Sequence, residues 1–175
     1  MQYASIRDFY TQLTNDPNSQ ENVLSNLWFN ILREYFLARE GFGLEIRPRL
    51  TEHDDVTIQY VNAVRSDIRT TRVILAVDER VFESQPPDSA WSSVVSQLTE
   101  CMKLASAAQS GVAWAERIFG IATIGCDSRF YVLGQGEDVL SDYPAAGGES
   151  LEFEADESRI VELLMSIKAE ALPES

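Results

Sequence analysis

The chain has 175 residues, about the length of one domain, and 45% of them are apolar, enough for a substantial hydrophobic core. Its 28 acidic and 14 basic residues give a net charge of −14, which disfavours nonspecific binding to nucleic acid. One histidine (His53) and two distant cysteines exclude an ordinary Cys/His zinc site, and no glycine-rich phosphate-binding motif occurs. The composition remains compatible with a site in which Asp or Glu carboxylates bind Mg²⁺ or Mn²⁺.

The N-terminal segment predicts a short amphipathic helix rather than a targeting signal. Apolar residues recur at helical spacing from Tyr3 to Leu13, and the basic and apolar regions of a signal peptide are missing. No apolar run in the chain approaches the roughly 20 residues of a membrane span. We therefore expect no membrane association and an intracellular protein, cytoplasmic or nuclear, with Cys101 and Cys126 as reduced thiols.

A second helix is predicted after the break NDPNS, with Ser19 as its N-cap. Apolar residues recur at helical spacing from Val23 to Phe36, and the helix ends before Gly41. So broad an apolar stripe predicts a helix packed against a sheet. An edge strand is predicted next, over Gly43–Pro48, where the proline ends it.

Two further strands are predicted after the polar loop that contains His53. In DVTIQYV the residues Val56, Ile58 and Tyr60 alternate with polar ones, which is typical of a strand. The stretch VILAVDER, from Val73 to Arg80, is almost entirely apolar until its end, as expected of a central strand covered on both faces.

The second half of the chain predicts two more helices and two or three strands. The resulting order is ααβββαββ(β)α, which predicts one α/β domain over residues 1–175, with a mixed sheet flanked by helices. The predicted elements are a helix over Ala90–Ala108 capped by Asp88 or Ser89, strands Ile118–Ile124 and Arg129–Leu133 joined by GCDS, a short strand in SLEFE, and a helix over Ser158–Ala171.

The end of the stretch VILAVDER is the main functional candidate. Residues i and i+2 of a strand project to the same face, so Asp78 and Arg80 are predicted to be neighbours while Glu79 points away. If this strand pairs as a hairpin with the one that begins near Asp55, the two aspartates could share a divalent cation. Arg80 would then supply positive charge to a phosphate, which would make a phosphodiester-cleaving centre.

This arrangement resembles the PD-(D/E)XK nuclease-like superfamily, whose restriction-endonuclease-like fold has an αβββαβ core. The matching residues are Asp55 and Asp78 for the two acids and Arg80 for the usual lysine. Glu21 stands where members often carry a glutamate on the first core helix. Gln97 matches the QxxxY motif of a subset, although Cys101 replaces its tyrosine. The resemblance spans about residues 19–133 and leaves residues 149–171 as an acidic extension. Among proteins of this superfamily, the chain looks most like short nuclease-like proteins of filamentous fungi.

The resemblance implies a phosphodiesterase that depends on Mg²⁺ or Mn²⁺ and acts on DNA or RNA. Asp55 and Asp78 would bind the metal, Arg80 would hold the phosphate, and Glu21 and Gln97 would position metal or water. Arginine keeps the charge of the family's lysine but does not release a proton near neutral pH, which leaves enzymatic activity open.

Several alternatives stay open at this point. Asp54 and Asp67 compete with Asp55 as the first acid. Asp78 and Arg80 could form a strand-end ion pair without catalysis. The chain could then be an inactive nuclease-fold protein that acts as an acidic protein-interaction module for a basic partner, or a plain structural subunit.

Overall fold

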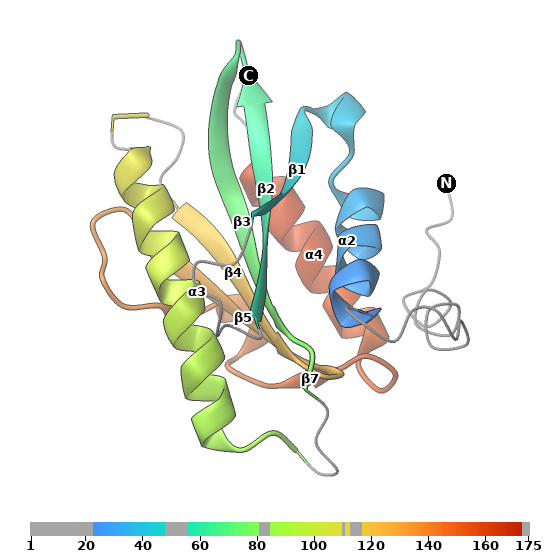
Figure 1. Cartoon of the computed structure of the whole chain (residues 1–175). Helices are drawn as coiled ribbons and strands as arrows, with labels where there is room; N and C mark the ends of the chain where they lie inside the picture. The colour runs from blue at the N-terminus through green and yellow to red at the C-terminus, as the bar shows by residue number, and fades with distance from the viewer. Residues whose placement is uncertain (1–22, 48–55, 81–84, 110, 113–116, 173–175) are drawn as a thin grey trace.

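A mixed β-sheet forms the centre of the molecule (Figure 1). The computed structural model describes residues 23–47, 56–80, 85–109, 111–112 and 117–172. In this part of the chain the sheet has seven strands: six follow the order β1-β2-β3-β4-β5-β6, and β7 lies off this path and pairs with β5. Neighbouring strands are antiparallel except β3 and β4, which are parallel. The bounds are β1 (Phe42–Arg47), β2 (Val56–Arg65), β3 (Ile68–Asp78), β4 (Arg117–Ile124), β5 (Asp127–Gly134), β6 (Ser141–Asp142) and β7 (Leu151–Glu152).

Helices cover both faces of the sheet. The helix α3 packs on one face, and α2 and α4 pack side by side on the other (Figure 1). The bounds are α2 (Val23–Tyr35), α3 (Asp88–Ala108) and α4 (Glu157–Ala171), with 3-10 helices η1 (Ala38–Glu40) and η2 (Pro144–Ala146). The prediction of an α/β fold with a mixed sheet between helices is therefore confirmed for the described residues.

Alternation along β2 and β3 separates two hydrophobic cores. On β2, Val56, Ile58 and Tyr60 all contribute to the core beneath α3, as predicted from their spacing. On β3, Ile74 contributes to the same core, whereas Leu75 contributes to the core beneath α2 and α4. Because both faces of β3 are covered, this strand needs apolar residues at nearly every position, which explains its sequence.

The crossover between the parallel strands β3 and β4 runs through α3 (Figure 1). The helix approaches β4 closely at Gly120, where an added Cβ would lie 2.6 Å from the Met102 Sδ. Glycine at this position therefore lets α3 sit close to the sheet.

Some boundaries differ from the predictions. Helix α3 begins at Asp88, and its N-cap is Pro87, which makes no side-chain cap; the amides of Ala90 and Trp91 donate to the Pro87 carbonyl instead. The short strand β6 was not predicted, because its two residues are too few to show alternation. The predicted N-terminal helix and the Ser19 cap lie outside the described residues. Within the described residues, no helix is long and apolar enough to cross a membrane.

Candidate functional site at the end of strand β3

The residues Asp78, Glu79 and Arg80, which we call the DER corner, lie where β3 leaves the sheet. Asp78 is the last residue of β3, and its side chain is on the α3 side, in line with Ile74 and Ala76. It is fully buried, with 0% of its surface exposed. Its carbonyl oxygen accepts a hydrogen bond of 3.1 Å from the amide of Gly125, which ties the end of β3 to the β4–β5 turn.

The carboxylate of Asp78 is held by Arg80. The Arg80 Nε donates to both oxygens at 3.1 and 2.8 Å, and its Nη2 donates to Oδ2 at 2.6 Å. The Arg80 amide also donates to Oδ1 at 2.9 Å, which makes a local turn of the kind that Asp favours. Charge-assisted, bidentate hydrogen bonds of this type are strong and fix the relative orientation of the guanidinium and the carboxylate. The prediction that Asp78 and Arg80 are neighbours is thus confirmed.

Glu79 points to the opposite side and caps α2. Its two carboxylate oxygens accept hydrogen bonds from the amides of Leu24 and Ser25, at 3.0 and 2.7 Å. The first turn of α2 has no acidic residue of its own. A carboxylate at this position both satisfies amides that the helix leaves without partners and opposes the positive end of the helix dipole.

The hairpin pairing that the metal-site hypothesis requires is present between β2 and β3. Val56 lies directly opposite Asp78 in the antiparallel register, so the start of β2 lies beside the end of β3. The residue across from Asp78 is therefore apolar. Asp54, Asp55 and Glu21 lie outside the described residues.

Two other candidates lie apart from the DER corner. Asp67 is in the turn between β2 and β3, with a φ of 67°, at the opposite end of β3 from Asp78. The ten strand residues between the two acids separate them by roughly 30 Å or more, too far to share a cation. Gln97 is half-buried on α3, and its side chain makes no hydrogen bond with another described residue.

The contacts of the DER corner are structural ones. Across the described residues there is no group of three or more Asp, Glu, His or Cys side chains that could hold a metal ion. Asp78 pairs with Arg80, and Glu79 binds helix amides. These three residues join β3 to α2 and to the β4–β5 turn.

Sequence reasoning missed the capping role of Glu79 and a cavity elsewhere on the sheet. The capped amides are 54 and 55 residues away in the chain from Glu79, so no local pattern relates them. The cavity, described below, depends on how α3 lies over β1, β2 and β3.

Comparison with known proteins adds a distant structural likeness. No protein family model and no curated protein matches the chain. The crystal structure of a sex pheromone staph-cAM373 precursor is similar with a TM-score of 0.40 and 9% sequence identity. The match covers 88% of this chain and 57% of that one, so this chain spans little more than half its length.

Proposed function

We propose that this chain is a catalytically inactive protein of the nuclease-like fold that acts as an acidic protein-interaction module. The observation that carries the proposal is the state of the DER corner. Its carboxylates are both engaged within the protein, Asp78 with Arg80 and Glu79 with the N-terminus of α2. A divalent cation at Asp78 would have to displace a buried ion pair.

The order of elements supports the fold assignment. From α2 to β4 the chain runs helix, three strands, helix, strand, which is the αβββαβ order of restriction-endonuclease-like proteins. The three strands form an antiparallel meander, and the fourth is parallel to the third. The order of the elements and the directions of strand pairing therefore support the nuclease-like fold without depending on any single motif residue.

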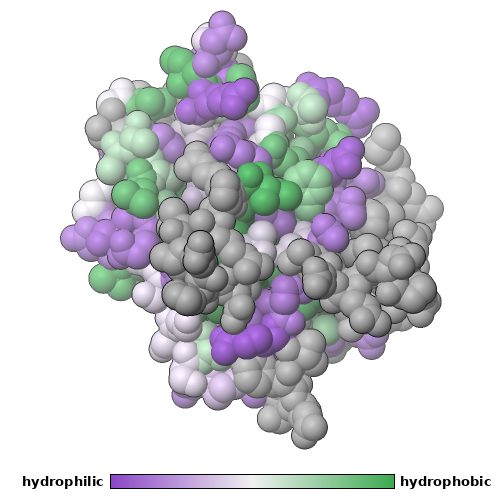
Figure 2. All heavy atoms as spheres, in the orientation of Figure 1, coloured by the Kyte–Doolittle hydropathy of each residue, from purple (hydrophilic) through white to green (hydrophobic). Residues whose placement is uncertain are grey.

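The charge of the C-terminal part supports a basic partner. Residues 149–172 contain seven acids and two cations, and both cations form ion pairs. Arg159 lies 3.4 Å from Glu162, and Lys168 lies 2.7 Å from Glu40. Exposed carboxylates such as Glu149 and Glu154 therefore leave this region negative. On the face seen in Figure 2, hydrophilic and hydrophobic residues are interspersed.

A metal-dependent phosphodiesterase is the second candidate function. The observation that favours it is the register of Val56 with Asp78, since it brings the start of β2, where the first acid is expected, beside the second acid. In that case Asp55 and Asp78 would hold Mg²⁺ or Mn²⁺, and Arg80 would turn from Asp78 to a phosphate.

The two functions are separated by metal binding and cleavage. We expect the wild-type protein and Asp78→Asn to show the same change of melting temperature in millimolar Mn²⁺, because Asp78 is paired rather than available as a ligand. Asp78→Asn should itself lose roughly 1.5–3 kcal/mol of unfolding free energy, the cost of removing hydrogen bonds to a charged group. Neither wild type nor Arg80→Lys should cleave DNA or RNA.

Mn²⁺-dependent cleavage that disappears in a folded Asp78→Asn variant would contradict the proposal and establish the phosphodiesterase. The same conclusion would follow if Arg80→Lys gained metal-dependent cleavage. Circular dichroism of each variant provides the control for folding.

The interaction module is tested with a labelled short peptide rich in lysine and arginine. We expect salt-sensitive binding by fluorescence anisotropy, because screening weakens contacts between exposed charges. Replacing Glu149, Glu154 and Glu162 together by glutamine should weaken binding about tenfold, since each exposed charge pair contributes roughly 0.5 kcal/mol.

The matched control for this measurement replaces three exposed acids elsewhere, Asp67, Glu100 and Asp138, by their amides. Equal loss of affinity in the two triple variants would mean that only net charge matters and would argue against a specific acidic surface.

A further inference from the structure

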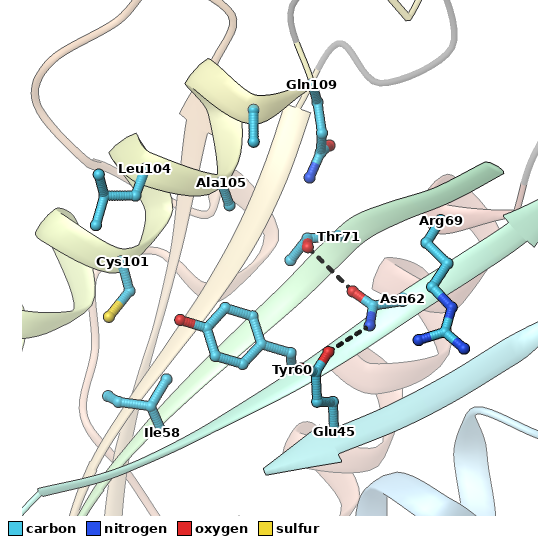
Figure 3. A pocket seen from close by; sticks show the side chains of 11 residues that line it. Glu45, Ile58, Tyr60, Asn62, Arg69, Thr71, Cys101, Leu104, Ala105 and Gln109 are labelled. Atoms are coloured by element: carbon cyan, nitrogen blue, oxygen red, sulfur yellow. Dashed lines mark hydrogen bonds between the residues drawn. The ribbon is translucent and has the colours of Figure 1, made fainter. Parts of the chain in front are cut away.

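A cavity of about 430 Å³ lies between the C-terminal half of α3 and the strands β1, β2 and β3 (Figure 3). None of the three residues of the DER corner lines it. Its volume is in the range of small-molecule binding sites in proteins. It is thus a second candidate site, independent of the proposed interaction surface.

A chain of polar side chains crosses three strands at the floor of this cavity. Thr71 on β3 donates a hydrogen bond of 3.0 Å from Oγ1 to the Oδ1 of Asn62 on β2. Asn62 in turn donates from Nδ2 to the Oε2 of Glu45 on β1, at 3.3 Å (Figure 3). Asn62 and Thr71 are both buried. These contacts fix the orientation of the Asn62 amide and thereby preorganise the polar floor.

A β-bulge in β3 places Thr71 in this chain. The register pairs Val61 with Val73 and Asn62 with Thr71, so Arg72 is the extra residue. The Arg72 guanidinium turns toward α4, where its Nη2 donates to the Glu170 carbonyl at 3.0 Å. Without the bulge, strand alternation would place Thr71 on the α4 side. The cavity therefore has a polar floor because the strand is irregular at this point.

The cavity lining carries one charge of each sign. Glu45 contributes a carboxylate, and Arg69 contributes a guanidinium. Figure 3 shows Asn62 between these two side chains. Arg69 is exposed and forms no ion pair with a described residue.

The opposite wall is mostly apolar. It is formed by Ile58 on β2 and by Leu104 and Ala105 on α3, with the ring of Tyr60 beside them (Figure 3). Leu104 is 64% exposed, so part of this wall is hydrophobic surface that a bound molecule would cover. Gln109 also lines the cavity; it is buried, and its Oε1 has no hydrogen-bond partner among the described residues.

We propose that this cavity binds a small zwitterion with an apolar body, of the class of a free α-amino acid with an apolar side chain. Its ammonium group would lie toward Glu45, its carboxylate toward Arg69, and its side chain against Leu104 and Ala105. A ligand with only a negative charge would face Glu45, and one with only a positive charge would face Arg69. A zwitterion complements both, and electrostatic complementarity of this kind sets specificity.

The test uses L-leucine and four relatives as probes in isothermal titration calorimetry. N-acetyl-leucine keeps only the negative charge, leucine methyl ester keeps only the positive charge, glycine lacks the apolar body, and 4-methylpentanamide keeps the apolar body but carries no charge. We expect saturable binding of leucine and at least tenfold weaker binding of each relative. Amide shifts in NMR spectra should be largest at Asn62, Thr71 and Ala105.

Two variants should reverse the preference among the probes. Arg69→Gln should weaken leucine binding about tenfold and improve binding of the methyl ester, because the repelling cation is gone. Glu45→Gln should weaken leucine binding and improve binding of N-acetyl-leucine. Arg39→Gln makes the same change of charge as Arg69→Gln at an exposed residue that does not line the cavity, and it should leave all affinities unchanged.

Ala105→Phe gives a further check that does not depend on charge, since it should fill the cavity and abolish leucine binding. The proposal is overturned if leucine shows no saturable binding, if N-acetyl-leucine or the methyl ester binds as tightly as leucine, or if Ala105→Phe binds leucine like the wild type. Equal leucine affinity in Arg69→Gln and wild type would also overturn it. A melting curve of each variant shows that its fold is retained.

Discussion

Asp127 is the residue whose environment most clearly predicts an effect of pH on stability. It begins β5 directly across from Glu152. Burial raises its pKa from the ordinary value, the nearby carboxylates of Glu152 and Asp156 raise it further, and Arg129 opposes them. Since the folded state holds the proton of Asp127 more tightly than the unfolded state does, this residue favours folding at low pH. The benefit is lost as the pH rises through the pKa of the folded state.

We therefore expect Asp127→Asn to be more stable than wild type at pH 7. The gain should be less than about 1 kcal/mol, because the side chain is only partly buried and solvent screens its charge. The difference should vanish as the pH falls below the ordinary carboxyl value of 3.8. Urea unfolding at a series of pH values measures it, with the exposed Asp138→Asn as control. If the stability difference between Asp127→Asn and wild type grew toward acidic pH, folding would not raise the pKa of Asp127.

At the scale of elements, the end of β3 organises the helix that precedes it in the chain. Glu79 binds the first turn of α2, and Gln59 of β2 donates from Nε2 to the Ser25 carbonyl at 2.8 Å. Helix α2 is thus held to the central hairpin by polar contacts at its N-terminus as well as by its apolar face. Lys168 and Glu40 add a contact between α4 and η1.

Glu79→Ala should reduce the unfolding free energy by about 1–2 kcal/mol, because two amides of α2 lose their acceptor and the helix dipole loses its compensating charge. Glu79→Gln should lose less, since it keeps one acceptor oxygen. Chemical denaturation gives both values, and hydrogen exchange should show faster exchange of the Leu24 and Ser25 amides in the alanine variant. Unchanged exchange at these two amides would mean that the cap does not stabilise α2.

At the scale of the whole molecule, three layers place two separate regions of polar chemistry on one sheet. The DER corner lies at one end of β3, and the polar floor of the cavity lies toward its other end, near the β2–β3 turn. Between them β3 is apolar on both faces, from Val73 to Val77. We therefore expect that a change in one region leaves the packing that supports the other undisturbed.

Much of this arrangement was predictable from the sequence because secondary structure leaves a local periodic signal. Alternation in β2 predicted the face of Val56, Ile58 and Tyr60, and the continuous apolar run predicted that β3 is covered on both sides. The spacing of Asp78 and Arg80 predicted their contact. Each of these depends only on where successive side chains point along one strand.

Tertiary structure alone decided the partners that those side chains meet. Glu79 finds α2 amides that lie more than fifty residues earlier in the chain, as the hydrogen bonds show. The bulge at Arg72 changes the face of Thr71, and no residue pattern marks it. The cavity exists because α3 covers β3 and β4 more fully than β1 and β2. Register, bulges and helix placement depend on how distant segments pack, and a periodic pattern within one segment carries no information about them.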